Sequence, residues 1–410
     1  MGKVYDIAII GGGAAGLFAA ATLSSYVREG NTLNVILLEK MHRCGLKIGI
    51  TGKGRCNLTN TKPWNEFSTH IHPKNIFLKN SFYAMSNMAV MEFFEGIGLP
   101  LVVERGDRVF PQSMKALDVV AALERHILGG GIEIRKNSPV ASVSHYPDNF
   151  IVEMANGGKI ESRTVIIATG GMSYPTTGSS GDGYAFAKGL GHKITPCFPS
   201  LTALTPKNYR EDFYGISLKN VSVQLVVNGD VVQEEFGDLD FTNGGIEGPI
   251  GFKVSRKGVH SIINGQRVEL RLDMKPAVTE KQLQERINRE LAQIKGDQLK
   301  GLLHKLLPGS LVKLFIEENR GIAVSNLHQR LKCWSFPIAG YVGYERCVVT
   351  AGGVSLQEVS QKSMESKLVE GLYFAGEVLD LDGDTGGYNL QIAFSTGAMA
   401  AASAAAKVTR

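Results

Sequence analysis

The sequence predicts an α/β fold in which a parallel sheet is assembled from both ends of the chain and interrupted by a long insertion. Three observations predict it. An apolar run at 4–10 leads into a glycine cluster, a helical stretch and a second apolar run at 33–40. Two later segments, 164–171 and 371–397, again pass from an apolar run into glycines. Between them, apolar and polar residues alternate at 222–236, which is typical of strands with one buried face.

Composition allows two or three domains with a substantial core. The chain has 410 residues, of which 43% are apolar and 20% charged, a globular balance. The formal net charge of +5 is spread along the chain. It weakly favours anionic ligands, and it lacks the clustered Lys and Arg of a nucleic-acid-binding surface. We therefore do not expect a nucleic-acid partner.

The first apolar run and its glycines predict a dinucleotide site. Gly11, Gly13 and Gly16 have the GxGxxG spacing, directly after a strand and at the start of a helix over 14–28. A helix N-terminus offers unpaired N–H groups and a positive dipole end to a pyrophosphate. Glu39 ends the second strand, where a carboxylate can bind a ribose and disfavours a 2′-phosphate. The ligand is therefore expected to be FAD or NAD.

The two later strand–glycine segments favour FAD. One ends in Thr169-Gly170-Gly171, and the other ends its strand at Gly376-Glu377 before a helix begins near Asn389. A helix that points its N-terminus at a flavin ring stabilises the negative charge of the reduced ring. Asp380 is placed to reach ribityl hydroxyls. NAD dehydrogenases with a single dinucleotide site do not need this second site, whereas flavoproteins with a two-dinucleotide fold do.

Seven segments spread over nearly the whole chain form a recognisable set. They are GGGAAG (11–16), TGKGRCNLTN (51–60), ERGDRVFPQSMKA (104–116), ATGGMSYPTTGSSGDGYAFAKGLGH (168–192), FTNGGIEGP (241–249), VTAGGV (349–354) and MESKLVEGLYFAGEVLDLDGDTGGYNLQIAFSTG (364–397). This set resembles the YhiN/BaiN-like flavoproteins, which include the aminoacetone-oxidase-like enzymes.

The resemblance implies three domains. We expect a Rossmann-like, two-dinucleotide-fold FAD domain at 1–195 and 355–410. We expect an inserted, β-barrel-like domain at 196–275 and 327–354 that carries the substrate wall, and a small helical domain at 276–326. Two positions depart from the family pattern. Lys53 stands where the family commonly has glycine, and Glu247 stands where it has serine before Gly-Pro.

The stretch TGKGRCNLTN is expected to form the inner wall of the FAD site. A P-loop is excluded, because no strand with GxxxxGK[ST] spacing precedes Lys53 and no Ser or Thr follows it. The glycines would let backbone approach the cofactor. Arg55 would offset phosphate charge or pin the loop, and Asn57 would reach the polar edge of the ring. We interpret Cys56 as a packed apolar residue, with a redox thiol as the alternative.

The predicted site involves residues from every part of the FAD domain, including Val140 on the adenine side. No catalytic residue and no metal ligand is assigned. The predicted cofactor-binding residues are Gly11, Gly13, Ala14, Ala15, Gly16, Glu39, Lys40, Lys47, Gly52, Gly54, Arg55, Cys56, Asn57, Val140, Thr169, Gly170, Gly171, Gly376, Glu377, Asp380, Gly387, Asn389, Leu390 and Gln391.

The insertion offers weaker signals. Asn-Gly-Asp at 228–230 predicts a hairpin turn, and Thr279 a helix N-cap for 278–307. His260 and His328 are interpreted as surface residues. Tyr341 and Tyr344 are interpreted as core or interface residues, although they could hydrogen-bond a substrate.

Cysteine usage and the single complete GxGxxG motif bear on the electron partner. Cys44 and Cys56 are twelve residues apart, too far for the close pair of a disulfide reductase. With no second dinucleotide motif, either oxygen reoxidises the flavin or NAD(P)H visits transiently as a donor. The odd, widely spaced cysteines fit a reducing, cytoplasmic location, and no segment is expected to span a membrane.

The leading hypothesis is an FAD-dependent oxidoreductase that acts on a small molecule by hydride transfer. The resemblance offers two substrate types, a small amine or amino-ketone that is oxidised and an enone that is reduced at its C=C bond. A flavoprotein that acts on RNA and a non-catalytic flavin-binding protein are the alternatives. The sequence leaves the substrate, the electron acceptor and the oligomeric state open.

Overall fold

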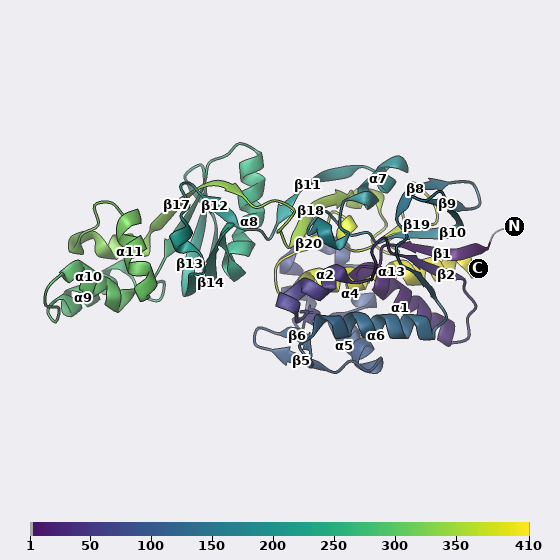
Figure 1. Cartoon of the computed structure of the whole chain (residues 1–410), viewed down its shortest axis with the longest axis horizontal. Helices are drawn as coiled ribbons and strands as arrows, with labels where there is room; N and C mark the ends of the chain where they lie inside the picture. The colour runs from purple at the N-terminus through teal and green to yellow at the C-terminus, as the bar shows by residue number, and fades with distance from the viewer. Residues whose placement is uncertain (1–2, 410) are drawn as a thin grey trace. The chain divides into compact units, whose positions relative to one another are not determined.

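The computed structural model describes residues 3–409, and they divide into two compact units. The first comprises the chain up to Phe198 and the segment from Val349 onward, and the second runs from Pro199 to Val348. The first unit is therefore built from both ends of the chain, and Figure 1 shows purple and yellow segments side by side within it.

The first unit is centred on a parallel sheet. The strands β1 (Val4–Ile10), β2 (Val35–Leu38), β7 (Glu133–Arg135), β10 (Lys159–Ile167) and β19 (Leu372–Phe374) are ordered β7-β2-β1-β10-β19 and all pair in parallel. The central strands are buried on both faces, as their continuous apolar runs require. The sequence prediction of an α/β fold with a Rossmann-type sheet is confirmed.

The long strand β10 changes partners along its length. Its first half pairs antiparallel with β9 (Phe150–Met154), which continues to β8 (Val140–His145), whereas its second half pairs with β19. The remaining strands of the unit form small sheets. They are β3 (Thr59–Asn60), β4 (Ile71–His72), β5 (Leu101–Glu104), β6 (Arg108–Pro111), β11 (Ile194–Ser200), β18 (Val349–Val354) and β20 (Asp382–Gly383).

Three helices of the first unit pack together through aromatic rings. The ring of Phe18 in α1 (Ala14–Arg28) lies 4.8 Å from that of Phe394 in α13 (Tyr388–Val408), centroid to centroid, and contacts Phe93 of α5 (Asn87–Gly96) at 4.9 Å. The other helices of the unit are α2 (Leu46–Ile50), α3 (Trp64–Phe67), α4 (Lys79–Ala84), α6 (Ala116–Gly129) and α7 (Asp182–Gly189). In Figure 1, α1 and α6 lie on the same side of the sheet.

The second unit contains a closed barrel. Its strands follow the order β12-β15-β14-β13-β16-β17, and β17 pairs back with β12. They are β12 (Leu204–Pro206), β13 (Ser217–Val227), β14 (Asp230–Thr242), β15 (Gly245–Glu247), β16 (Val268–Asp273) and β17 (Trp334–Tyr341). Asn228 and Gly229 both have positive φ in the β13–β14 turn, so the predicted hairpin is present. The β-barrel-like prediction is also confirmed.

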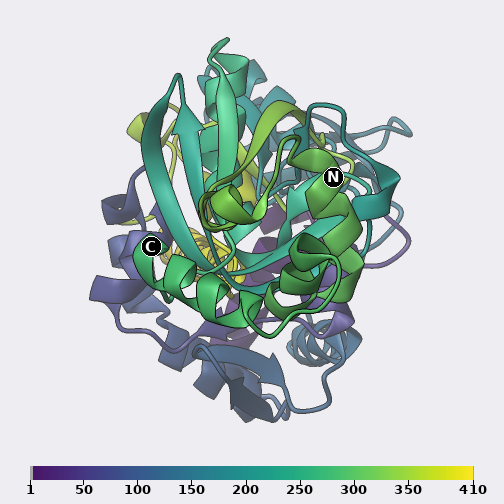
Figure 2. The ribbon, with the colours of Figure 1, turned by 90° about the vertical axis from the view of Figure 1, so that its left-hand side faces the viewer.

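Helices complete the second unit. The helix α8 (Gly248–Ile263) packs against the barrel at Gly258, where an added Cβ would lie 3.0 Å from Leu204. Thr279 forms a capping box with Gln282 at the start of α9 (Glu280–Leu291). The helices α10 (Gln298–Leu306), α11 (Gly309–Glu318) and α12 (Leu327–Lys332) follow. Figure 2 shows α9–α11 facing the viewer. A single helix over 278–307 is not observed, because α9 ends before Gly296, whose φ is positive.

Within residues 3–409, none of the helices combines the length and the apolar character needed to cross a bilayer.

Candidate functional site

The four central parallel strands end in register and define one edge. Leu38, Ile10, Ile167 and Phe374 are paired across the sheet, so the residues that follow them lie along the same carboxyl edge. Predicted site residues stand there on every strand: Gly11 after β1, Glu39 after β2, Thr169 after β10 and Gly376 after β19. The carboxyl edge is where open α/β sheets bind their ligands.

The three glycines of the first motif have different surroundings. A Cβ on Gly11 would lie 2.6 Å from the carbonyl oxygen of Ala168, and one on Gly16 would lie 1.8 Å from that of Gly11. These two glycines therefore allow close backbone packing. Gly13, the N-cap residue of α1, has no heavy atom within 4 Å of the corresponding position. The space in front of the α1 N-terminus is open, as a bound pyrophosphate requires.

Glu39 is buried and holds this turn in place. One carboxylate oxygen accepts a 2.7 Å hydrogen bond from the Gly12 N–H, and the other accepts one of 2.7 Å from the Met41 N–H. Each oxygen keeps a further lone pair, so the predicted ribose contact remains available in addition to this structural role. Lys40, which follows, contacts Ser180 and forms a 2.6 Å ion pair with Asp182.

The stretch TGKGRCNLTN adopts a strained turn. Gly52, Lys53, Gly54 and Cys56 all have φ between +57° and +83°. This left-handed region is cheap for glycine and costly for other residues, by roughly 1 kcal/mol each. Lys53 is exposed. The repeated left-handed backbone turns the chain sharply between α2 and β3.

Arg55 and Cys56 hold this loop against the rest of the unit, Arg55 through polar contacts and Cys56 through burial. The guanidinium of Arg55 donates to Glu104 at 3.1 Å and lies 4.5 Å from the centre of the Phe110 ring. Of the two roles considered for Arg55, the structure shows the pinning contact. Cys56 is fully buried, and burial raises the pKa of its thiol to about 12. A thiol held neutral in this way is a poor nucleophile, in agreement with the interpretation of Cys56 as a packing residue.

Asn57 joins the loop to the last helix. With its amide oriented to satisfy both ends, the oxygen accepts from the Gly387 N–H at 3.1 Å and the nitrogen donates to the Thr59 carbonyl at 3.0 Å. Gly387 approaches the same backbone so closely that an added Cβ would lie 2.4 Å from Thr59. The loop therefore packs directly against the N-terminus of α13.

The polar side chains at the start of α13 are already hydrogen-bonded within the protein. Asn389 bonds the backbone of Gly383 in both directions, at 2.8 Å each, and the buried Gln391 bonds Thr59, Met85 and Ser395. Leu390 packs on the core. The first-turn N–H groups of α13 are thus what this helix can offer a cofactor, and the predicted contacts of its side chains stay a prediction.

A polar network lies behind the sheet edge. Glu377 accepts from Lys47 at 2.6 Å, from the Ser173 hydroxyl at 2.7 Å and from the Thr350 N–H at 2.9 Å. Gly171 packs against this network, because an added Cβ would lie 2.6 Å from the Thr350 hydroxyl oxygen. Lys47 and Glu377 were predicted to bind the cofactor, and they pair with each other here.

The remaining predicted residues occupy different positions around the edge. Gly376 approaches Ala15 so closely that an added Cβ would lie 2.7 Å from its side chain. Asp380 follows, half-buried, with its N–H donating to the Val354 carbonyl. Val140 begins β8 beside the core, and its adenine contact stays a prediction. Gly170 has a positive φ of 74°.

The residues at the edge fit FAD. Besides the open space before Gly13, the hydroxyl oxygen of Thr169 is buried and has no hydrogen-bond partner among residues 3–409. A buried polar atom of this kind calls for an additional partner. Two helix N-termini belong to this region. That of α1 follows β1 at the sheet edge, and that of α13 is hydrogen-bonded to Asn57 of the loop at 51–57. The α1 end suits a pyrophosphate, and the α13 end suits the anionic edge of a reduced flavin.

The sequence reasoning missed a cluster beside α13. His70 and His72 both hydrogen-bond the carboxylate of Asp384, at 2.8 Å and 3.2 Å. The histidines are 314 and 312 residues from Asp384, so no local spacing pattern could reveal the cluster. The available signal was two histidines one residue apart in a short segment next to the predicted loop.

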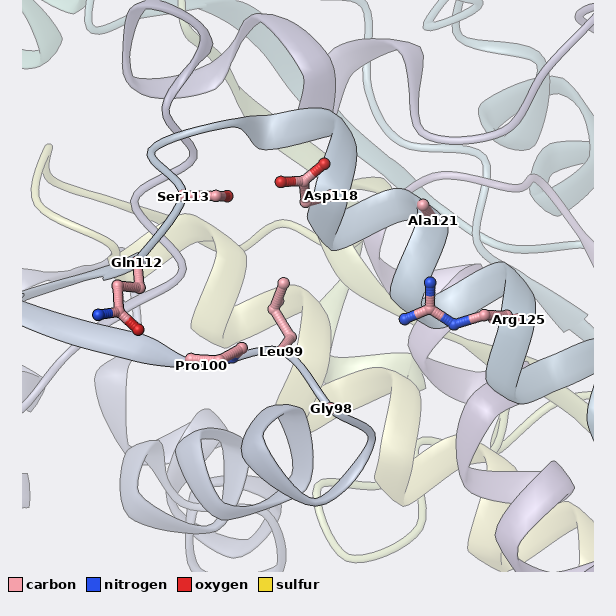
Figure 3. Close-up of a pocket in the computed structure, with 8 residues that line it drawn as sticks. All are labelled: Gly98, Leu99, Pro100, Gln112, Ser113, Asp118, Ala121 and Arg125. Atoms are coloured by element: carbon pink, nitrogen blue, oxygen red, sulfur yellow. The ribbon is translucent and has the colours of Figure 1, made fainter.

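A separate pocket of about 470 Å³ opens beside α6 (Figure 3). Asp118, Ala121 and Arg125 line it from one face of the helix, and the side chain of Asp118 extends toward Ser113. None of its lining residues belongs to the carboxyl edge of the sheet, so this pocket is not the FAD site. Its lining residues are Gly98, Leu99, Pro100, Gln112, Ser113, Asp118, Ala121 and Arg125.

The residues of the second unit that the sequence analysis considered belong to different helices and strands. Glu247 precedes α8, and Tyr341 ends β17. His328 is partly buried near Glu280, at 3.4 Å, and His260 is exposed next to Asn264. The described residues contain no group of three or more His, Cys, Asp or Glu arranged to hold a metal ion.

The sequence profile of a family described as "HI0933-like protein Rossmann domain" matches residues 5–403. The chain belongs to this family. Among curated relatives, the 3-dehydro-bile acid delta(4,6)-reductase of Clostridium scindens is 30% identical over 97% of this chain and 98% of its own. The ribosomal RNA dihydrouridine synthase of Haemophilus influenzae is 30% identical over 97% of both chains. The Escherichia coli protein of the same name is 30% identical over 96% of both.

A solved structure supports the fold assignment. The 3-ketosteroid delta1-dehydrogenase of Sterolibacterium denitrificans matches 99% of this chain and 100% of its own, with a TM-score of 0.52 and 13% identity. The likeness at this identity concerns the fold. With the family, the relatives and the sheet-edge geometry together, the chain is an FAD-dependent oxidoreductase with a Rossmann-type domain.

Proposed function

We propose that this oxidoreductase reduces a C=C bond that is conjugated to a carbonyl group. The observation that carries the proposal is the kind of reaction for which the curated relatives are named. These relatives match at least 96% of the chain at 30% identity. One is named for reducing double bonds of a bile acid, and two are named for making dihydrouridine. Dihydrouridine differs from uridine by two hydrogens across a double bond conjugated to a carbonyl. The substrates differ greatly, but the bond that changes is of the same kind.

The residues of the first unit divide the binding of FAD between two helix ends. The α1 N-terminus, open in front of Gly13, would hold the pyrophosphate, with Glu39 next to the ribose. The α13 N-terminus, held by Asn57, would lie at the anionic edge of the ring. Bound FAD supplies hydride transfer. We further propose NAD(P)H as the electron donor. Its binding would be transient, because the one complete GxGxxG motif is assigned to FAD and no second dinucleotide motif is present in the sequence.

We favour a small carbonyl compound as the substrate and a cytoplasmic location, which the five free cysteines suit. Anaerobic single-turnover kinetics would test the reaction. The bound flavin is first reduced and then mixed with a steroid enone, with the saturated ketone of the same skeleton as the matched control. The proposal is supported if the enone reoxidises the flavin and the saturated ketone does not. Reoxidation by oxygen with release of peroxide from an amine substrate, but not by any enone, would overturn it.

Uridine in RNA is the second candidate substrate, because two relatives carry that activity in their names. The segment 275–332, which contains α9–α12, has eleven Lys or Arg and six Asp or Glu. Its excess of five positive charges equals the net charge of the chain, so the charge is less evenly spread than expected above. RNA binding would weaken steeply with salt. Measuring binding to a ribosomal RNA fragment at low and moderate salt decides this point, since salt-insensitive or absent binding removes the candidate.

A further inference from the structure

Two histidines and an aspartate form a compact hydrogen-bonded cluster beside α13. The antiparallel pairing of β4 with β20 brings Ile71 and His72 next to Asp382 and Gly383. The Asp384 N–H then donates to the His70 carbonyl at 3.0 Å. Both oxygens of the Asp384 carboxylate are used, one by Nδ1 of His70 at 2.8 Å and the other by Nε2 of His72 at 3.2 Å.

The cluster is fixed to the first turn of α13. The ring of His70 stacks on the ring of Tyr388, the first residue of the helix, with 4.4 Å between centroids and 24° between planes. The Asn389 side chain donates to the Asp384 carbonyl at 3.2 Å. A movement of the helix N-terminus would therefore move the cluster too.

The hydrogen bonds determine where the protons lie. Burial alone would raise the pKa of Asp384, but hydrogen bonds from His70 and His72 outweigh it and lower the pKa to about 2. An ionised carboxylate only accepts, so the two ring nitrogens that face it carry hydrogen. His70 Nε2 and His72 Nδ1 remain as the nitrogens that can gain or lose a proton. The histidine side chains are 25% and 32% exposed, whereas that of Asp384 is 16% exposed.

Other ionisable side chains belong to the same region, and one of them is the buried Asp382, which pairs with His72 in the β4–β20 ladder. Burial raises the pKa of the Tyr388 phenol, and the nearby carboxylates of Asp384, Asp107 and Glu66 raise it further. Glu66 and Asp107 in turn pair with Lys62, at 2.9 Å and 3.5 Å. The phenol therefore stays protonated near neutral pH, and the outer carboxylates are compensated by a lysine. The two imidazoles are the side chains of the cluster that can both donate and accept a proton at a ring nitrogen.

We propose that His70 and His72, positioned by Asp384, hold and deliver the proton that accompanies hydride transfer at this site. The inference rests on the proposed function, since adding hydrogen across a conjugated C=C bond requires one hydride and one proton. Bound FAD, once reduced, would supply the hydride. The proton leaves a ring nitrogen of the histidines as its N–H bond breaks, and a C–H bond forms at the substrate carbon next to the carbonyl. The neutral imidazole regains a proton from water.

The variants are His70→Asn, His72→Asn, the double variant and Asp384→Asn, with His304→Asn on the exposed face of α10 as the matched control. Asparagine keeps a polar side chain but does not titrate. In the double variant we expect kcat to fall by about 10²-fold or more with KM changed only a few-fold, as for loss of a general acid. In wild type the rate falls as pH rises, because the donor loses its proton. In Asp384→Asn kcat should also fall, because the rings lose the carboxylate that positions both of them.

A spectroscopic readout does not depend on turnover. Nitrogen-15 NMR of the histidine rings should show hydrogen on Nδ1 of His70 and Nε2 of His72, and this pattern should be lost in Asp384→Asn but kept in His304→Asn. Cofactor content is measured in parallel, so a variant that fails to fold or to bind FAD is recognised. An unchanged pH–rate profile in the double variant with FAD bound overturns the inference.

A failed proposed function can be separated from a failed inference. If wild type reduces no enone, proton uptake on anaerobic reduction of the bound flavin is measured with an indicator dye in weak buffer. Uptake with a pH dependence that is lost in the double variant still supports the histidines as the proton-holding group. Uptake identical to wild type at every pH overturns it.

Discussion

Of the three glycines in the first motif, Gly13 is the one whose predicted role concerns ligand binding and not backbone packing. A Cβ on Gly11 or Gly16 would collide with backbone, whereas a Cβ on Gly13 would have no other described part of the chain within 4 Å. The GxGxxG spacing identified all three residues, because their roles follow from local backbone geometry. The motif also predicts their division of roles, with Gly11 for the turn, Gly13 for the approach to the phosphates and Gly16 for helix–strand packing. What the sequence could not show are the atoms that Gly11 and Gly16 contact.

We expect Gly13→Ala to change the free energy of unfolding by no more than about 0.5 kcal/mol, since the added methyl has space and φ is −81°. FAD affinity should fall at least about tenfold, or ~1.4 kcal/mol, because the methyl occupies the pyrophosphate space. Chemical denaturation and FAD titration measure the two effects. Gly96→Ala, which also has open space, is the matched control. It should leave FAD affinity unchanged, and it should raise the free energy of unfolding by at most about 1 kcal/mol. Equal FAD affinity for Gly13→Ala and wild type would place the cofactor elsewhere.

The cysteines differ sharply in their accessibility. Cys333 is exposed, whereas Cys56 is fully buried with its pKa raised to about 12 and Cys197 is partly buried with its pKa raised to about 11. A thiol reagent should therefore label Cys333 first in the native protein and reach Cys56 only on unfolding. Mass spectrometry of labelled peptides checks the order. Cys56→Ser should keep flavin redox activity while losing about 1–3 kcal/mol of stability from the buried hydroxyl. Loss of turnover with FAD still bound would instead indicate a redox thiol.

Asp384 also makes the free energy of unfolding depend on pH in the acidic range. Its pKa in the folded protein is about 2 against an ordinary value of 3.8, so its ionised form stabilises the folded state above pH 4. That contribution, at most about 2 kcal/mol, is lost as pH falls from 4 through 2. Asp384→Asn should thus cost more stability at pH 6 than at pH 3, where the loss should be roughly half. Urea unfolding at the two pH values measures the difference. An equal loss at both would mean that the carboxylate is not held ionised by the histidines.

At the scale of elements, the loop 51–57 acts as a connector between a small sheet and a helix. Arg55 joins it to Glu104 and Phe110 of the β5–β6 pair, and Asn57 joins it to α13. The segment could be recognised from its residues as a wall of the site. The partners could not, because Glu104 lies 49 residues from Arg55 and becomes its neighbour only when β3 pairs with β6.

The two roles of Arg55 make opposite predictions for its partner. If Arg55 acts by pinning the loop, Arg55→Ala and Glu104→Ala should weaken FAD binding to a similar extent, about three- to tenfold each, since a charge-assisted hydrogen bond contributes roughly 1 kcal/mol at a partly exposed site. The double variant should be no worse than either single one. FAD titration measures all three. A large loss in Arg55→Ala with none in Glu104→Ala would assign Arg55 to the phosphates.

Element boundaries show where local patterns were sufficient. The strand β1, the helix α1 and the β13–β14 hairpin follow the predicted ranges closely, because each is determined by apolar periodicity and nearby glycines. The side chains of Asn389 and Gln391 illustrate the limit. They stand at the predicted helix start, but their hydrogen bonds go to Gly383, Thr59 and Met85, which only the tertiary fold brings near.

For the whole molecule, the second unit departs from and returns to one place in the first. The Val348 N–H donates to the Leu201 carbonyl at 3.1 Å, and the Ser355 N–H donates to the Lys193 carbonyl at 3.0 Å. The outgoing strand β11 and the returning strand β18 pair with each other. The insertion therefore begins and ends at a single β-ladder.

Replacing residues 199–348 with a short Asn-Gly turn should leave a folded, FAD-binding protein without turnover. The sheet edge, both helix N-termini and the loop 51–57 all belong to the first unit, and the paired β11 and β18 can be closed by a hairpin turn. Flavin absorbance and thermal unfolding test this. A protein that folds but retains no FAD would show that the second unit contributes to cofactor binding.

The division of the first unit between the two chain ends also determines the timing of assembly during synthesis. The strand β19 and the helix α13 follow the barrel unit in the sequence, so the edge of β10 that pairs with β19 stays unpaired while the barrel unit is made. Domains fold as units as they emerge, so the barrel unit can be complete before the FAD site exists. A nascent chain cannot hold its cofactor at both helix ends until α13 has been translated. A stop codon placed just before β19 should therefore yield a chain with a folded insertion and no flavin.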